Sequence, residues 1–235
     1  MDDLVLDTFW KIGERPSDYL PEKSIWTLKD FLHAYSSRVA MMQIPSRLDS
    51  LYGEFHPWLT RYFSIASSTQ SVYSIVDSFS SGTEESFESF FSLFRDFYAE
   101  ASVRAIEPQR SGPFPNRCDV LELIRSIRRR PELFLGYPHL SGLNAYLCGY
   151  ERAGADLGLP KTPADIFFDE FRKWIVEDKF PGGRPRSWYK LILFWSLHDC
   201  GATSSSAYTF FFVLLDEYAT KSGRPGAFEI DQSQI

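Results

Sequence analysis

The sequence predicts an all-α protein in which two tandem, pseudo-symmetric five-helix repeats pack into one compact bilobal molecule. Three observations predict this fold class. Apolar residues recur with the spacing of helix faces, no convincing β-hairpin or βαβ pattern interrupts them, and one stretch near the N-terminus reappears far along the chain. The length of 235 residues allows a sizeable core, and 44% hydrophobic with 24% charged residues is ordinary for a soluble globular protein.

The repeated stretch is "GERPSDYLPEKSIWTLKDFLHAY", and its companion is "RRRPELFLGYPHLSGLNAYLCGY". Residues 12–35 align without gaps to residues 127–150, and seven of these 24 positions are identical, where chance gives about one or two. The similarity continues with small changes of offset, which are expected at surface loops. In the last helix Phe90 and Phe91 match Phe210 and Phe211. Coincidence between two apolar helical patterns is the alternative, but the preserved order favours duplication.

The first copy is predicted to contain five helices. The second of them carries a clear apolar stripe, formed by Ile25, Leu28, Phe31, Leu32 and Tyr35. The last is predicted to be capped by Thr83, with Glu84 and Glu85 in the first turn, where the helix dipole favours negative charge. The predicted helices span residues 3–12, 25–42, 47–63, 71–79 and 84–99.

The second copy is predicted to contain five corresponding helices. Thr162 is a predicted N-cap, followed by Pro163 at the first helical position and by Asp165 near the positive end of the helix dipole. Gly223 is a predicted C-cap. The predicted helices span residues 119–129, 140–155, 163–178, 187–198 and 205–221, although "SWYKLILFW" alone also fits a buried strand.

The domain organisation follows from the repeat. Residues 1–100 form the first repeat, 101–117 a Pro-, Gly- and Ser-rich linker, 118–223 the second repeat, and 224–235 a C-terminal tail. The final helix is apolar nearly all round through "FFFVLL", so we expect it where the two copies pack together. Such a fused dimer has little need for another subunit, and we expect a monomer when it is free of its partner.

No motif in the sequence points to an enzyme, a cofactor or a metal site. His198, Asp199 and Cys200 are adjacent, but successive residues of a helix point in different directions, so a polar helix end is the simpler interpretation. The loop "PGGRPRS" could cradle a phosphate, but it lacks the Lys-Ser/Thr ending of a P-loop. We therefore expect a protein without catalytic residues, cofactor or metal.

The expected location is the cytoplasm. The acidic start "MDDLVLDTFWKIGE" lacks the basic and apolar regions of a signal peptide. The longest apolar run is "YTFFFVLL", far below the roughly 20 residues of a membrane span. Three cysteines without CxxC spacing fit a reducing compartment.

Charge separates the two copies. Residues 1–100 contain 8 Lys and Arg against 15 Asp and Glu, a net charge of −7, whereas residues 101–235 contain 17 against 16, a net charge of +1. A concentrated negative field repels nucleic acid and attracts basic partners, although an acidic face can also serve solubility alone. The acidic residues expected to bind a partner are Asp77, Glu84, Glu85, Glu88, Asp96 and Glu100.

Trp26 is a further candidate for partner binding. It lies off the apolar stripe of its helix, and the repeat matches it to Ser141, an exchange that is unusual in a core. An exposed Trp26 with Asp30 one turn further on would be a good interface anchor. Packing of Trp26 against a neighbouring helix or the linker is the alternative.

The second copy resembles a bacterial family. The motifs are "RRPELFLGYPHLSGLNAYLCGYERA", "FFDEFRKWIVEDKF", "SWYKLILFW" and "FFFVLLDEY", and they resemble immunity proteins encoded beside secreted antibacterial toxins, including type VI secretion effectors. The first copy is similar only loosely, because it has Ala34-Tyr35 in place of Gly-Tyr and ends in "LFRDFY". These motifs belong to the scaffold and identify no toxin-contacting residue.

The resemblance implies a cytoplasmic antitoxin that binds its cognate effector and blocks its active site or its loading. The charge is in agreement, since nuclease toxins that bind phosphate backbones are basic and an acidic inhibitor can mimic the polyanion. The first copy would then be the toxin-facing lobe. A binding module for a small apolar ligand in the aromatic-rich core is the alternative, and it would require a well-formed apolar cavity.

Overall fold

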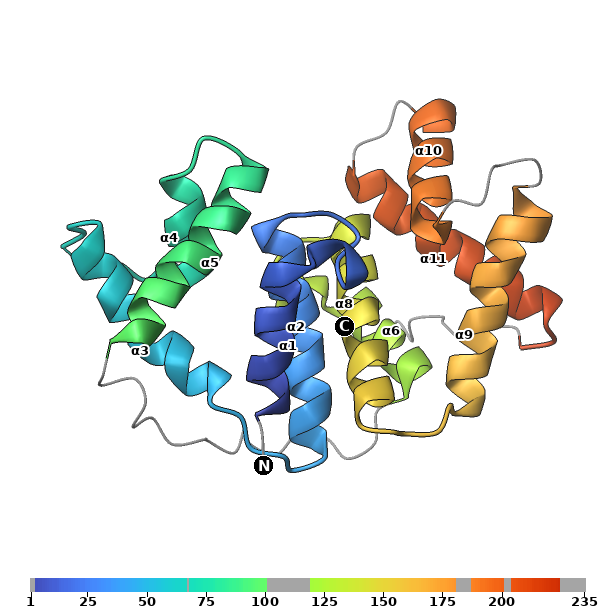
Figure 1. Cartoon of the computed structure of the whole chain (residues 1–235). Helices are drawn as coiled ribbons and strands as arrows, with labels where there is room; N and C mark the ends of the chain where they lie inside the picture. Colours follow the sequence, from blue (N-terminus) through green and yellow to red (C-terminus); the bar gives the residue numbers. More distant parts are fainter. Residues whose placement is uncertain (1–2, 67, 101–118, 181–186, 201–203, 225–235) are drawn as a thin grey trace. The chain divides into compact units, whose positions relative to one another are not determined.

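The protein is all-helical, as the sequence predicts. The computed structural model describes residues 3–66, 68–100, 119–180, 187–200 and 204–224 (Figure 1). These residues form eleven α-helices with short 3₁₀ and π-helical turns, and no β-strand occurs among them. Of residues 187–195, which alone also fit a strand, all but Ser187 lie in the helix α10 (Trp188–Cys200). The predicted linker 101–117 and nearly all of the predicted tail 224–235 lie outside the described residues.

Contacts between Cα atoms divide the chain into two compact units. The first unit consists of residues 1–116 and 145–158, and the second of residues 117–144 and 159–235. The helix α8 (Leu140–Asp156) is therefore shared, since its first five residues belong to the second unit and the rest to the first. The repeat boundaries proposed from sequence place all of α8 with the second copy, which is a different division of the same helices.

The first unit has a core of aromatic rings. Its helices are α1 (Leu4–Glu14), α2 (Ile25–Met41), α3 (Leu48–Tyr62), α4 (Val72–Ser78) and α5 (Thr83–Ala99), with a 3₁₀ turn η1 (Pro16–Asp18) between the first two. The predicted stripe of α2 is fully buried. Phe55 of α3 packs its ring against rings of α5, with ring centroids 5.8 Å from Phe90 and 5.0 Å from Phe94. Apolar burial of this kind is the main driving force of folding.

The second unit is built from helices in the same order. These are α6 (Val120–Arg129), the short α7 (Pro131–Phe134), the start of α8, α9 (Pro163–Trp174), a π-helical turn η3 (Ile175–Lys179), α10 (Trp188–Cys200) and α11 (Ser204–Lys221). All ten predicted helices are confirmed, with ends that differ by up to two residues except at the end of the predicted 163–178 helix, whose last turn is π-helical. The sequence prediction missed η1 and α7, because each is less than two turns long and begins with a proline that reads as a turn.

Local signals set the ends of several helices. Thr162 and Asp165 form the reciprocal capping box of α9: the Asp165 N–H donates to Thr162 Oγ1 (3.2 Å), and the Thr162 N–H donates to Asp165 Oδ2 (2.8 Å). Gly223 ends α11 with a φ of 73°. The N–H groups of Gly223 and Arg224 donate to the carbonyls of Thr220 and Ala219 at 3.1 and 2.8 Å, which is the Schellman arrangement. The caps predicted at Thr162 and Gly223 are confirmed, whereas the cap predicted at Thr83 is wrong, because Thr83 is the first residue of α5 and Gly82 is its N-cap.

Ring contacts recur inside the two units. Phe55 packs against Phe90 with an interplanar angle of 87°, and Phe171 packs against Phe211 with 83°. Further pairs correspond in the same way: Phe55–Trp58 with Phe171–Trp174, Phe55–Phe97 with Phe171–Tyr218, and Trp58–Phe97 with Trp174–Tyr218. If the units are copies, these pairs correspond to an offset of 121 between the last helices, whereas the sequence match uses 120. Runs of consecutive Phe residues match at either offset, and only the packing distinguishes them.

The apolar helix α11 packs within its own unit. Phe211 is fully buried against rings of α9 and α10, and the Tyr208 hydroxyl donates to the Ile127 carbonyl of α6 at 3.1 Å. Arg128 of α6 pairs with Asp216 through two hydrogen bonds of 2.9 and 2.8 Å. One side of the apolar run is open, because Val213 is 53% exposed. These contacts account for most of the apolar surface of α11, and its predicted role between the copies stays a prediction.

Candidate functional site: an acidic helix and an aromatic hollow

The helix α5 places four of the predicted partner-binding carboxylates on the surface of the first unit. Glu84, Glu85, Glu88 and Asp96 are exposed along α5, and the exposed Glu100 follows its last residue. Two of them are held by the chain itself: Lys23 Nζ lies 3.0 Å from Glu84 Oε1 and 2.6 Å from Glu88 Oε1. The hydrogen bonds that Lys23 donates, first to Glu88 and then to Glu84, raise the pKa of Lys23 above its ordinary value. Lys23 therefore offsets part of the negative charge at the start of α5.

Two further carboxylates accept hydrogen bonds from other residues of the first unit. Glu85 Oε2 accepts a hydrogen bond from the Ser81 N–H at 2.8 Å and another from the Ser81 hydroxyl. These bonds lower the pKa of Glu85 below its ordinary value and fasten the chain before the first turn of α5. Glu100 accepts a hydrogen bond from the indole N–H of Trp58. Asp96 differs from them, since no hydrogen bond or ion pair joins its side chain to another described residue.

The Trp26–Asp30 pair does not form the exposed anchor that the sequence analysis proposed. Trp26 is half-buried and donates its indole N–H to Asp77 Oδ2 at 3.3 Å, which connects α2 to α4. Asp30 is only 1% exposed, with Lys29 Nζ 3.5 Å from its carboxylate. Burial raises the pKa of Asp30 to about 7, against a smaller lowering by Lys29. The expectation of a surface carboxylate at residue 30 is therefore wrong, because α4 covers this part of α2.

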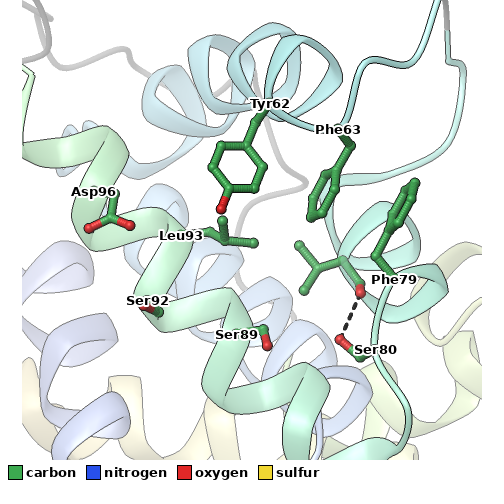
Figure 2. A pocket seen from close by; sticks show the side chains of 9 residues that line it. Tyr62, Phe63, Phe79, Ser80, Ser89, Ser92, Leu93 and Asp96 are labelled. Atoms are coloured by element: carbon green, nitrogen blue, oxygen red, sulfur yellow. Dashed lines mark hydrogen bonds between the residues drawn. The ribbon is translucent and has the colours of Figure 1, made fainter.

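An aromatic hollow lies between the ends of α3 and α4 and the middle of α5 (Figure 2). It has a volume of about 250 Å³ and is lined by Tyr62, Phe63, Val76, Phe79, Ser80, Ser89, Ser92, Leu93 and Asp96. Figure 2 shows Ser89, Ser92 and Asp96 along one side of α5, with Tyr62 reaching toward that helix from α3. Phe63 and Phe79 stack on each other, with their ring centroids 4.2 Å apart and their planes 8° apart. All nine residues belong to the first unit.

Two large apolar residues of the hollow are strongly exposed. Tyr62 is 58% exposed and Phe79 is 55% exposed, and among the described residues of the first unit the other large apolar residue with comparable exposure is Met42. Exposed apolar residues that gather in one place usually mark an interaction site, whereas scattered ones are normal. Of the nine lining residues, only Asp96 carries a formal charge at pH 7. The hollow therefore presents ring faces, hydroxyl groups and one carboxylate to the same occupant.

Most of these residues could not be found from the sequence. Asp96 was predicted from the acidic composition of the first repeat, but Tyr62, Phe63 and Phe79 read as ordinary core aromatics. The one signal for them is the short polar segment after each: "SIASST" follows Phe63 and "SSGT" follows Phe79. An aromatic at the end of a helix, before a polar segment, has fewer neighbours to cover it.

The other candidates from the sequence are placed as follows. His198, Asp199 and Cys200 lie at the end of α10, and the structure describes none of their side chains. Residues 181–186 of the loop "PGGRPRS" also lie outside the described residues. Within the described part of the chain, no three or more His, Cys, Asp or Glu side chains gather as a possible metal site. No described helix combines the length and the apolar character that crossing a bilayer requires.

Comparison of the chain with protein-family models, with curated proteins and with solved structures gives no match.

Proposed function

We propose that the chain is an immunity protein that binds and neutralises a cognate antibacterial toxin by stoichiometric protein–protein contact. The observation that carries the proposal is the surface of the first unit, where an acidic helix borders a hollow with exposed aromatic rings. Interfaces are rich in aromatic anchors at the centre, and charged residues around them speed association with a partner of opposite charge. The resemblance of the second copy to immunity proteins supports the same role.

The toxin that fits this surface is basic, as a nuclease effector would be. An enzyme that binds phosphate backbones needs a positive surface. The first hundred residues carry a net charge of −7 and can face such a surface, whereas the rest of the chain carries +1. Asp77 is half-buried beside Trp26, whereas Glu84, Glu85, Glu88, Asp96 and Glu100 are exposed and are the carboxylates proposed for this contact.

The two units are, in this proposal, diverged copies of one five-helix ancestor, arranged with pseudo-symmetry. The common order of helices and the corresponding ring pairs around Phe55 and Phe171 support a common origin. Duplication would let one copy keep the ancestral packing while the other changed its surface for recognition.

A small apolar ligand is the second candidate, and the exposed rings of the hollow are what favours it. The volume of about 250 Å³ lies below the roughly 300–1,000 Å³ of typical ligand sites. The lining also includes three serines and a carboxylate, which an apolar ligand would leave without partners. A protruding side chain of a protein partner is the better fit.

The test is co-expression with the protein encoded by the neighbouring gene. The wild-type chain should restore growth to cells that express that protein and should form a complex with it at a 1:1 ratio in light scattering. The triple variant Glu84→Lys, Glu85→Lys, Glu88→Lys should slow association at least ten-fold, since it reverses the field that attracts a basic partner. Undiminished association of a normally folded triple variant would reject this placement of the binding surface.

Lys23→Ala is the matched control for charge. It removes the cation that bridges Glu84 and Glu88 and makes the surface more negative without touching a carboxylate. Association should become faster at low salt, and the gain should disappear at about 0.5 M salt, where the Debye length falls to a few Å.

A further inference from the structure

Several residues of the hollow have equivalents in the second unit, and their contacts there indicate what the hollow holds. The ring pairs that correspond between the units set the equivalence: Trp58 corresponds to Trp174, and Phe97 to Tyr218. At the same offset as Phe97, Asp96 corresponds to Glu217. Both are carboxylates on the outer side of the last helix of their unit.

The π-helical turn η3 shifts the offset between corresponding residues of the two units. A π-helical turn takes up one more residue than an α-helical one, so the offset rises by one across η3, and Tyr62 then corresponds to Lys179 and Phe63 to Phe180. Contacts agree with this register. Tyr62 stacks on Trp58 at 5.2 Å, and Lys179 Nζ lies 5.5 Å from the ring centroid of Trp174. Phe63 stacks on Phe79, and Phe180 stacks on Trp195 at 5.1 Å with planes 16° apart.

In the second unit, the corresponding carboxylate, Glu217, binds Lys179 of the same chain. Lys179 Nζ lies 2.6 Å from both carboxylate oxygens of Glu217 while it sits over the Trp174 ring. A cation above an aromatic face and against a carboxylate combines a cation–π contact with a charge-assisted hydrogen bond. In the first unit a tyrosine replaces the lysine, and the Asp96 side chain makes no ion pair with a described residue.

We propose that the hollow of the first unit binds a lysine or arginine side chain of the partner protein, with its cationic group against Asp96 and its methylene stem along Tyr62 and Phe79. The proposal rests on the proposed function, because it names the residue type by which the basic toxin engages this surface. The contact of Lys179 with Glu217 in the second unit is the same kind of contact, made within the chain. The serines at 80, 89 and 92 can accept the remaining N–H groups of an ammonium or guanidinium.

A protein is favoured as the source of this cation over a nucleic acid or a small molecule. Asp96 and the net charge of −7 in residues 1–100 oppose a phosphate backbone. The hollow is open and has room for one large side chain, so most of the affinity must come from the surface around it, which a folded partner can cover.

The experiment titrates the full chain with the peptide acetyl-Ala-Leu-Lys-Leu-Ala-amide and with its arginine analogue, and follows amide ¹H–¹⁵N shifts by NMR. The expected result is saturable shifts at residues 62–64, 79–80 and 89–96 with millimolar affinity. The analogue that carries Nε-acetyl-lysine should bind at least ten-fold more weakly, since it keeps the stem and removes the charge. Absence of shifts at these residues at 10 mM peptide, or equal binding of the neutral analogue, would overturn the proposal.

Two variants test the assignment of residues. Tyr62→Lys gives the first unit its own lysine beside Asp96, as in the second unit, and should abolish the shifts, whereas Tyr62→Phe should retain them. Asp96→Asn should weaken binding about ten-fold, and Glu170→Gln, at an exposed carboxylate of α9, should leave it unchanged. Thermal unfolding of each variant separates a lost site from a lost fold, since all three side chains are at the surface.

The outcomes also separate this proposal from the proposed function. Peptide binding without neutralisation of the neighbouring gene's product keeps the cation site and rejects the immunity role. Neutralisation that is unaffected by Tyr62→Lys and Asp96→Asn keeps the immunity role and rejects the cation site. A dimer in light scattering that Asp96→Asn dissociates would make a second copy of this chain the occupant and would overturn the choice of partner.

Discussion

At the scale of single residues, burial decides what a charged side chain can do. Asp30 and Asp96 are both aspartates on helices of the first unit, and the sequence offers no reason to separate them. Asp30 lies under α4 and is 1% exposed, whereas Asp96 lies on the open side of α5. Asp30 therefore lowers the stability of the folded protein when it is ionised, whereas Asp96 is available to a partner.

Asp30 should make the protein less stable as the pH rises. Its pKa is about 7 in the folded state and 3.8 ordinarily, so the folded state binds more protons between these values and the unfolding free energy falls as pH rises through them. The loss is absent below about pH 4 and complete above about pH 8, and it amounts to at most about 4 kcal/mol. Asp30→Asn should therefore raise the stability at pH 8 and leave it nearly unchanged at pH 4.

Urea unfolding at several pH values measures this effect. Comparison with the wild type removes contributions of Glu85 and Asp169, whose pKa values are lowered and whose stability effect has the opposite sign. A parallel pH dependence in Asp30→Asn and the wild type would show that the Asp30 carboxylate is ionised in the folded protein at little cost.

At the scale of elements, the helices α2 and α8 approach each other closely in the first unit. A Cβ atom added at Gly149 of α8 would lie 2.2 Å from the Phe31 carbonyl oxygen of α2. Backbone cannot move aside as a flexible side chain can, so only glycine permits this approach of the two helices. The sequence match "GY" with Ala34-Tyr35 in the first copy gave no hint of this requirement, because the partner of the glycine is far away in the sequence.

Gly149→Ala should destabilise the protein by about 2–4 kcal/mol. This lies at the upper end of the cost of overpacking, because the added methyl group meets backbone. Gly53 of α3 is the matched control, since nothing lies within 4 Å of a Cβ atom added there. Gly53→Ala should stabilise the protein by about 0.5–1 kcal/mol through its better helix propensity. Denaturant unfolding of both variants provides the test. Equal effects of the two substitutions would mean that α2 and α8 do not approach each other this closely.

At the scale of the whole molecule, the chain is divided by contacts in a way that the repeat does not indicate. The last twelve residues of α8 belong to the first unit, although the repeat assigns the entire helix to the second copy. The Tyr35 hydroxyl donates to Asp156 at 2.9 Å, and Arg38 donates to the Tyr150 carbonyl at 2.7 Å. Residues 145–156 of α8 therefore belong to the first unit, although residues 117–144 of the second unit separate them from the rest of it in the sequence.

Hydrogen exchange can test this division with two equivalent core substitutions. Phe55→Ala and Phe171→Ala each remove a fully buried ring from one unit, at a cost of about 3–5 kcal/mol. Phe55→Ala should lower the protection of residues 145–156 together with α1 to α5, whereas Phe171→Ala should mainly affect α6, α9 and α11. The division is wrong if residues 145–156 lose protection with Phe171→Ala and keep it with Phe55→Ala.

The sequence by itself determined the helical class, the order of ten helices with most of their ends to within two residues, the caps at Thr162 and Gly223, and the charge difference between the halves. These properties depend on local spacing and composition, which a chain carries without its fold. Only the tertiary structure decided that Asp30 is covered and Asp96 open, that Tyr62 and Phe79 stand at the surface, and that α8 lies against α2. Each depends on which residues meet across large distances in the sequence, and the local pattern does not record those partners.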